Sequence, residues 1–425
     1  MARGALILVV AATSGAIAAL GAAAMAAADA GPPTRSVPAH LHQAITAYLM
    51  ASDKEGPARL QKALGALKGD LRLAADALRT LPPLTQARPS TQHGLEFSSS
   101  GKAWEYSIHL PSGYDGKKRH AALVLPDHVS VDPEAAIGFW KDKPGADNYV
   151  LFRPVILKHK EDPTRFPDAQ FFAVDQAIAA VMRDALVHLR RHYAVDPDRI
   201  ALTGLSQAGY YAWYYAASFP DQFSAVIPES AGGMAVRAAV LPLASNLAAV
   251  AVRILHARGD GICPYADAVG MRDAIQKAGG RVELITYEDS DYGGEPFPKR
   301  HPGPHHLRLQ NVLPWAAEQR RAAPHRFTRV VRYRQQGFEG RFNVPPPAKA
   351  GEPITVKLSD ENGVLSADRP KVGYLVAPDD VLSGREFKVG GKAVKPKADL
   401  KLLLESFKEN HDAGRLAAAE VRVTP

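Results

Sequence analysis

The sequence predicts an α/β fold in which a doubly wound, mostly parallel sheet follows a small helical region and precedes a β-rich region. The first observation is that short apolar runs alternate with amphipathic helical stretches between residues 121 and 321. This alternation is typical of a parallel sheet with helices on both faces. The second is a change of periodicity outside that part. Apolar residues recur every three to four positions in 37–82, whereas 325–425 holds short β-type runs between Pro and Gly turns.

The same observations divide the 425 residues into four parts. Pro82, Pro83 and Pro89 end the first helical stretch, and Pro324 ends the alternating part. One helical stretch, at 400–408, interrupts the β-type runs that follow. We therefore expect a signal peptide at 1–30, a helical N-terminal region at 36–88, an α/β domain at 94–323 and a β-rich accessory domain at 325–425.

Individual elements of the α/β domain follow from length and periodicity, because buried strands read as short apolar runs and helices show three- and four-residue spacing. Strands are expected at 94–97, 104–108, 121–125, 149–157, 200–205, 223–228, 252–256 and 282–287. Helices are expected at 174–193, directly after Ser206, at 267–278 and at 307–321.

The N-terminus carries the pattern of a secretory signal peptide. Arg3 precedes the apolar run 5–10, an Ala/Gly-rich stretch follows, and Ala28-Asp29-Ala30 supplies the small residues of a cleavage site. An uncleaved anchor is the alternative, because residues 5–28 carry no charge. The protein is therefore expected to be secreted or periplasmic, with no stable membrane insertion after the signal is removed.

The composition indicates a globular protein and gives no sign of nucleic-acid binding or of disulfide bonds. The content of 46% hydrophobic and 23% charged residues is typical of a globular protein. The net charge of +8 is scattered and accompanies no nucleic-acid-binding motif, so no nucleic-acid partner is expected. The single cysteine, Cys263, cannot form an internal disulfide. Nothing near it in the sequence would activate its thiol, so a small buried residue is expected there.

The strongest chemical signal is the segment Gly204-Leu-Ser-Gln-Ala-Gly209. A strand-type run precedes it and a helix-compatible stretch follows. A strand, a sharp turn that exposes a hydroxyl and a helix together make a nucleophile elbow. The small residues let strand and helix approach closely, and amides at the helix N-terminus can stabilise an oxyanion. Ser206 is therefore the candidate nucleophile.

A serine nucleophile needs a base that takes its proton and an acid that orients the base. Asp260 is the candidate acid. It lies in a loop shortly after the strand-type run 252–256, and the reacting groups of an open α/β sheet gather at the carboxyl ends of its strands.

Five segments, which span about half of the chain, resemble the α/β-hydrolase fold family, specifically its secreted esterase and prolyl-oligopeptidase-like branch. The resemblance implies hydrolysis of carboxylic esters or related acyl compounds through an acyl-serine intermediate. The segments are Pro111-Ser-Gly-Tyr-Asp115, Val195-Asp-Pro-Asp-Arg-Ile200 leading into Ser206, Phe219-Pro-Asp-Gln-Phe223, Pro228-Glu-Ser-Ala-Gly-Gly233 and His256-Ala-Arg-Gly-Asp260.

Two departures from the family pattern concern the oxyanion hole. Ala208 replaces the usual second glycine of the elbow, with Gly209 after it. The family's His-Gly-Gly type loop after the first central strand reads Leu125-Pro-Asp-His-Val-Ser130 in this sequence. The resemblance implies that main-chain amides of Gln207 and His128 hold the oxyanion.

A third departure concerns the base. The family's histidine follows the strand expected at 282–287, but Tyr292 stands at about that place. His301 is the first choice, because it is expected in a lengthened loop. His305 and His306 are the alternatives; they are expected to begin the last helix, where the dipole disfavours an imidazolium. No carboxylate or thiol stands at ligand spacing around the three, so neither a metal nor another cofactor is expected.

The sequence thus predicts a secreted serine hydrolase that acts on a small-molecule or polymer ester, with Ser206, Asp260 and His301 as catalytic residues. Two alternatives stay open. One is a serine peptidase of the same fold. The other is a catalytically degenerate scaffold used for binding, which Tyr292 at the expected histidine position favours. The oligomeric state is not predicted.

Overall fold

The computed structural model describes residues 36–128, 132–159, 162, 171–288, 301, 311–322, 326–332, 338–339, 341–345, 347–348 and 352–423. The predicted signal peptide at 1–30 lies outside these residues. Among the helices that the described ranges contain, none combines the length and the apolar character that crossing a membrane requires.

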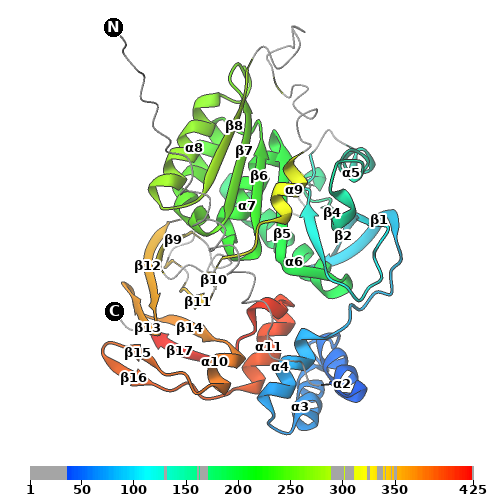
Figure 1. Ribbon diagram of the computed structural model, residues 1–425, viewed down its shortest axis with the longest axis vertical. Coiled ribbons are helices and arrows are strands. Elements are labelled where there is room, and N and C mark those ends of the chain that lie inside the picture. Colours follow the sequence, from blue (N-terminus) through cyan, green and yellow to red (C-terminus); the bar gives the residue numbers. More distant parts are fainter. Residues whose placement is uncertain are drawn as a thin grey trace, which may run out of the picture.

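An eight-stranded sheet forms the upper part of the molecule in Figure 1, in the order β1-β2-β4-β3-β5-β6-β7-β8. β2 is antiparallel to both of its neighbours, and the pairs from β4 to β8 are parallel. The strands span Ser90–Ser99 (β1), Lys102–Leu110 (β2), His120–Val124 (β3), Tyr149–Pro154 (β4), Val195–Leu205 (β5), Ala225–Glu229 (β6), Ala251–Ala257 (β7) and Val282–Tyr287 (β8).

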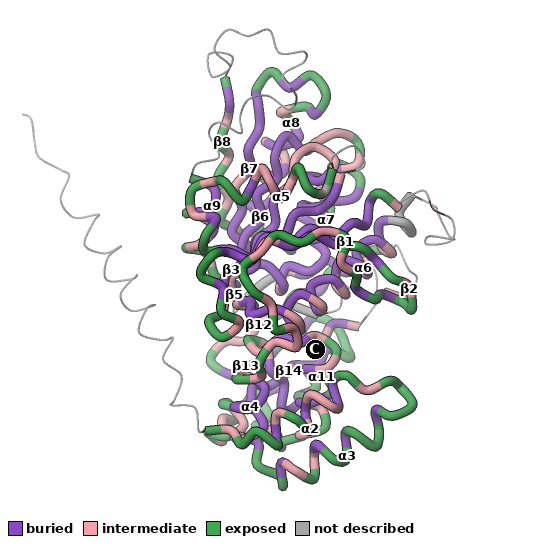
Figure 2. Tube along the Cα trace, turned by 90° about the vertical axis from the view of Figure 1, so that its right-hand side faces the viewer, coloured by how far each residue is buried: buried purple, intermediate pink, exposed green. Residues whose placement is uncertain are grey.

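Helices cover both faces of this sheet. Because side chains alternate along a strand, β3 places Ala122 and Val124 against one helical layer and Ala121 and Leu123 against the other. The predicted doubly wound α/β fold is therefore confirmed, and Figure 2 shows the buried interior that results. The first layer holds α6 (Phe171–His192), α7 (Gln207–Ser218) and α8 (Tyr265–Lys277), and the second holds α5 (Pro133–Lys141) and α9 (Val312–Ala317).

The predicted β-rich C-terminal region is also confirmed: two sheets enclose a common core that contains Val356, Tyr374 and Phe387. One sheet consists of β10 (Phe338–Glu339), β11 (Phe342–Asn343), β14 (Val372–Val376) and β17 (Ala419–Val423). The other consists of β16 (Lys392–Val394), β15 (Phe387–Val389), β13 (Val364–Ala367), β12 (Ile354–Glu361) and β9 (Arg326–Val331).

The two ends of the chain share one hydrophobic core. Leu403, Leu404 and Phe407 of α11 (Leu400–Asn410) pack in the same cluster as Leu41 and Leu78 of the N-terminal helices. Figure 1 shows α11 beside α3 and α4. The division of the chain at 36–88, 94–323 and 325–425 stays a prediction, but its first and last parts are joined by this core. The N-terminal helices are α2 (Ala39–Leu49), α3 (Gly56–Leu67) and α4 (Leu71–Arg79).

A buried arginine connects the central sheet to the segment after α11. The Arg321 guanidinium donates to both carboxylate oxygens of Asp412, at 2.6 and 3.0 Å, and its Nε donates to Asp198 in β5 at 2.9 Å. The side chains of Arg321 and Asp412 are 1% and 2% exposed. Burial opposes both charges, but their mutual attraction raises the pKa of Arg321 and lowers that of Asp412.

This geometry predicts that Arg321→Gln lowers the free energy of unfolding by about 3–5 kcal/mol, because Asp412 would remain buried without its partner. Urea unfolding followed by circular dichroism measures the change. The matched control is Arg320→Gln, whose side chain is 51% exposed and pairs with Asp196 at 3.2 Å. A surface pair of this kind should cost less than about 1 kcal/mol. Equal losses in the two variants would contradict a structural role for the buried pair.

Candidate active site

Ser206 occupies a strained turn between β5 and α7. Its backbone angles are φ 55° and ψ −116°, in a region that non-glycine residues adopt only when the surrounding structure imposes it. The Ser206 N–H donates to the Glu229 carbonyl of β6 at 2.9 Å, which holds the turn against the neighbouring strand. The turn and the helix after it place the Ser206 hydroxyl at the carboxyl end of the sheet.

Close approach at this turn explains which residues there are glycine. A Cβ atom on Gly204 would lie 2.5 Å from the Ala208 main chain, and one on Gly209 would lie 2.7 Å from the Gly204 carbonyl oxygen. Both distances are shorter than any real Cβ contact. Ala208, by contrast, carries its methyl group and is 5% exposed. The close approach of strand and helix therefore requires glycine at 204 and 209 but not at 208, so Ala208 leaves the elbow intact.

The structure brings the three predicted catalytic side chains into one hydrogen-bonded chain. The Ser206 hydroxyl lies 2.9 Å from His301 Nε2, and His301 Nδ1 lies 2.8 Å from Asp260 Oδ2. With Nδ1 donating to the carboxylate, Nε2 is the acceptor that faces the serine. His305, His306 and Tyr292 lie outside the described residues, so the structure makes no comparison between them and His301.

The positions of these residues along the sheet identify the fold. The serine follows β5, the aspartate follows β7 and the histidine comes after β8, in a sheet ordered β1-β2-β4-β3-β5-β6-β7-β8. A serine on a strained strand-to-helix turn, with partners in the chain order Ser, Asp, His, completes the pattern. This is the α/β-hydrolase fold. The fold that the sequence segments led us to expect is thus confirmed.

Comparisons with known proteins find solved structures of esterases, other hydrolases and peptidases at low identity. No protein-family model matches the chain, and no curated protein sequence matches it. A thermostable esterase is 20% identical with a TM-score of 0.41, over 54% of this chain and 63% of that one. Dipeptidyl peptidase 4 from Porphyromonas gingivalis is 14% identical with a TM-score of 0.42, over 55% and 36%. S-formylglutathione hydrolase from Staphylococcus aureus is 12% identical with a TM-score of 0.39, over 55% and 100%.

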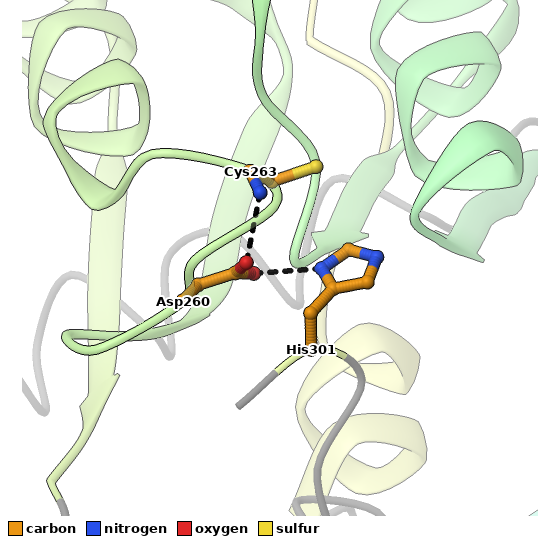
Figure 3. Close-up of side chains that lie close together, drawn as sticks. All are labelled: Asp260, Cys263 and His301. Carbon is orange, nitrogen blue, oxygen red and sulfur yellow. Dashed lines mark hydrogen bonds and ion pairs between the residues drawn. The ribbon is translucent and has the colours of Figure 1, made fainter. Parts of the chain in front are cut away.

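The loop after β7 holds Asp260 in place through its main chain (Figure 3). The N–H groups of Ile262 and Cys263 both donate to Asp260 Oδ1, at 2.9 and 2.8 Å. Oδ2 is thereby left for His301. Burial alone would raise the pKa of Asp260, but the hydrogen bonds from His301 and from the two amides outweigh it and lower the pKa. The carboxylate is therefore ionised and correctly turned toward the histidine.

His301 is 8% exposed and is stabilised as a cation. The hydrogen bond to Asp260 and the Cys263 thiol raise its pKa from 6.5 to about 9, against the opposing effect of burial. Cys263 is buried, as the sequence predicts, but it lies beside the histidine. One ligand atom from each of Asp260, Cys263 and His301 falls within 4.8 Å of the others, a donor set that suits a soft metal ion. We assign Asp260 and His301 to the hydrogen-bonded chain because they bond each other and His301 also bonds Ser206.

A second histidine supports the acid loop, and the sequence analysis did not give it a role. His256, in β7, is fully buried, and its Nε2 donates to the Cys263 carbonyl at 2.8 Å. The same nitrogen lies 3.5 Å from Asp260 Oδ2. Burial lowers the pKa of His256, so it is neutral and closes the loop by hydrogen bonding. The four-residue spacing of His256 and Asp260 across the end of a strand was the available signal.

The two residues expected to hold an oxyanion lie beside the serine. Gln207 is the first residue of α7, so its amide belongs to the helix N-terminus that begins at Ser206. His128 is half-buried and lines the same cavity as Ser206 and His301. Burial and the nearby Arg153 lower the pKa of His128, which keeps its imidazole neutral close to His301.

A cavity of about 540 Å³ opens next to Ser206. Its wall is mostly apolar, and α5 provides a large part of it through Ala135, Ala136, Phe139 and Trp140. α5 was not expected from the sequence, although Asp132-Pro133-Glu134 is a helix-start signal. The Asp132 carboxylate accepts from the Glu134 N–H at 2.8 Å and caps the helix. Two charged residues of the wall, Arg153 and Glu229, were also not expected there from the sequence.

The environment of His301 predicts an unusual titration. Its imidazole should lose its proton near pH 9, while His128 and His256 should titrate below 6.5. NMR of the histidine ring resonances between about pH 5 and 10, a range that includes the ordinary histidine pKa, measures these pKa values. The His301→Ala variant assigns the His301 signal. Asp260→Asn should bring the His301 pKa down toward 6.5. A wild-type His301 that titrates at or below 6.5 would overturn the assigned contacts.

The same shifts give a pH window for stability. The raised His301 pKa means that its contribution is complete below pH 6.5 and is lost as the pH rises through about 9. The lowered Asp260 pKa means that its contribution is complete above 3.8 and is lost as the pH falls through its folded value. The pair therefore stabilises the fold most between about pH 4 and 6.5.

Proposed function

We propose that this protein is a serine hydrolase that cleaves carboxylic esters through an acyl-serine intermediate, and that it acts outside the cytoplasm after removal of the N-terminal signal. The observation that carries the proposal is the continuous chain of contacts at the elbow. Ser206 Oγ lies 2.9 Å from His301 Nε2, and His301 Nδ1 lies 2.8 Å from Asp260 Oδ2. Nucleophile, base and orienting acid are thus within hydrogen-bond reach of one another.

Each residue has one role in the proposed reaction. His301 acts as a base only in its neutral form, whose share grows as the pH rises toward about 9. In that form Nε2 takes the proton of Ser206 as Oγ attacks the ester carbonyl carbon, and Asp260 stabilises the imidazolium that forms. The main-chain amides of Gln207 and His128 hold the oxyanion of the tetrahedral intermediate. His301 then gives the proton to the leaving alcohol, and the acyl-serine remains. Water, activated by the same nitrogen, releases the acid and restores Ser206.

The contact between His301 and Ser206 supports an active enzyme over the degenerate scaffold. The degenerate alternative depended on Tyr292 standing where a histidine was expected, and His301 supplies the base in its place. A peptidase of the same fold would use the same three residues. No described feature beyond them favours a peptide over an ester, so ester hydrolysis stays the proposal.

The cavity beside Ser206 supports an ester with a sizeable apolar group. Its apolar wall buries hydrocarbon, and burial stabilises by about 0.8 kcal/mol for each methylene. Phe139 and Trp140 of α5 contribute two aromatic faces to that wall. We therefore assign this cavity to the acyl or alcohol portion of the ester.

The first test is covalent labelling of Ser206. A fluorophosphonate should bind the wild-type protein once, with loss of fluoride, because only a serine with a working base attacks phosphorus. Intact mass spectrometry should show the adduct on wild type and on Ser98→Ala, an exposed serine used as control. Ser206→Ala should abolish both the adduct and ester hydrolysis while the circular dichroism spectrum is unchanged. Ester hydrolysis by a folded Ser206→Ala protein would show that Ser206 is not the nucleophile.

The second test identifies the base. His301→Ala should reduce kcat by at least about 10³-fold, because proton transfer and serine activation are both lost. His305→Ala and His306→Ala are the matched controls and should retain near wild-type kcat. If instead only His305→Ala or only His306→Ala lost kcat, that histidine would be the base and the assignment of His301 would be wrong.

The third test concerns the cavity. Phe139→Ala should lower kcat/KM for a p-nitrophenyl octanoate about tenfold more than for the acetate, because the long chain loses apolar contact. Ile285→Ala removes an apolar side chain that is 40% exposed and does not line the cavity, so it should leave the ratio unchanged. An unchanged ratio in Phe139→Ala would show that this cavity does not hold the hydrocarbon.

A further inference from the structure

A second cavity, of about 400 Å³, lies where three parts of the chain meet. The N-terminal helical region contributes Leu78–Pro83, and α11 with the residues after it contributes Phe407, His411 and Ala413. The α/β domain contributes the rest, including Val195 at the start of β5. Leu205, at the other end of β5, lines the cavity beside Ser206. The two cavities therefore lie at opposite ends of that strand, roughly 30 Å apart at the usual rise per residue.

All ionisable side chains that bear charge near neutral pH in this cavity are basic. No Asp or Glu is present among the described residues that line it. The remaining wall is largely apolar and includes Leu78, Leu81 and Phe407. The cavity thus has a cationic part and a hydrocarbon part. The charged residues are Arg79, Lys117, Arg119 and Arg190, and His411 also lines the cavity.

Two of these arginines bond only neutral oxygens within the described part of the chain. Arg190 donates to the Gln222 side-chain oxygen at 2.7 Å and to the Asn410 carbonyl at 2.8 and 3.2 Å. Arg119 donates to the Arg79 carbonyl at 2.7 Å. Arg79, by contrast, forms an ion pair with Asp379 at 2.6 Å. Arg190 is 7% exposed, and burial lowers its pKa to about 10.

The carboxylates that attract these two arginines accept their hydrogen bonds from other side chains, and one of them, Asp221 beside Arg190, accepts from the Gln222 amide. Asp412, which attracts both, is held by two hydrogen bonds from Arg321. Asp196, which attracts Arg119, pairs with Arg199 at 2.7 Å. A buried cation without its own counter-ion is costly. The described residues thus leave the positive charge of Arg119 and Arg190 incompletely neutralised.

His411 is a further basic side chain in the wall of this cavity. It is 7% exposed, and its Nδ1 atom is buried without a hydrogen-bond partner, which is uncommon for a buried polar atom. Its backbone is left-handed, with φ 48°, at the end of α11, and its ring packs on Phe407. Burial and the surrounding cations, Arg190 and Arg119 among them, hold its pKa well below 6.5. An anion in the cavity would oppose the effect of these cations and raise the pKa of His411.

We propose that this cavity binds a small organic anion, with a phosphate or carboxylate group held by Arg119 and Arg190 and its hydrocarbon part against the apolar wall. Guanidinium groups match the geometry of both oxyanions. The volume lies within the range of small-molecule sites. Because residues from the N-terminal helices, the sheet and α11 all line the cavity, the bound anion stabilises their association.

The test uses the full-length mature protein with phenyl phosphate, phenylacetate and inorganic phosphate as probes. The midpoint of thermal unfolding should rise with probe concentration and saturate, at an ionic strength held constant with NaCl. Isothermal calorimetry should give one site for each bound probe. Comparison of the two organic probes shows whether phosphate or carboxylate is preferred, and inorganic phosphate shows whether the hydrocarbon part is needed. A response no larger than that of NaCl for all three probes would overturn the proposal.

Variants place the binding in this cavity. Arg119→Gln should weaken the dissociation constant at least tenfold, because it removes a half-exposed cation that bonds only a carbonyl. Arg88→Gln, an exposed arginine outside the cavity lining, is the matched control and should bind as wild type does. If Arg119→Gln does not fold, His411→Asn serves instead, since Asn tolerates the left-handed backbone. Equal affinity of wild type and the cavity variant would refute the site.

Discussion

The structure depends first on the close contact of strand and helix at Ser206. Gly204 and Gly209 let β5 and α7 approach to a distance that a Cβ atom on either would prevent, and the bond from Ser206 N–H to the Glu229 carbonyl holds the turn. The unfavourable backbone angles of Ser206 persist because the sheet and the helix are both packed around them. The serine hydroxyl is therefore exposed by the same packing that builds the core.

The second constraint is the main chain of the loop after β7. Two amides hold one oxygen of Asp260, and His256 bonds the carbonyl of Cys263, so the carboxylate can present only its other oxygen to a histidine. A histidine that reaches this oxygen is oriented by the Asp260 loop, so it does not have to follow β8 directly. His301, 41 residues further along the chain, does reach it. Its distance from β8 in the sequence therefore does not prevent a working arrangement.

The N-terminal helices and the C-terminal region affect the site indirectly, because they pack against the α/β domain that carries it. The N-terminal helices and α11 share one core, and the Arg321–Asp412 pair ties the segment after α11 to β5. Arg329 of β9 donates to the last carbonyls of α7, at Ala217 and Ser218. The helix that begins at the serine thus ends against the C-terminal region. The basic cavity lies at the same junction, where a bound anion would reinforce contacts that the apolar core already makes.

Sequence by itself determined the α/β alternation, the elbow at Ser206 and the loop of Asp260, because these follow from local periodicity and from glycines at short spacing. It could rank His301 above His305 and His306 but could not place it, since its partner lies 41 residues away. It also did not reveal α5, the cavity beside Ser206 or the role of His256. Those depend on which side chains face one another across strands and helices. Only the tertiary structure decided that Gly209, rather than residue 208, carries the close contact, and that two distant helical segments form one core, because both are properties of packing between elements remote in sequence.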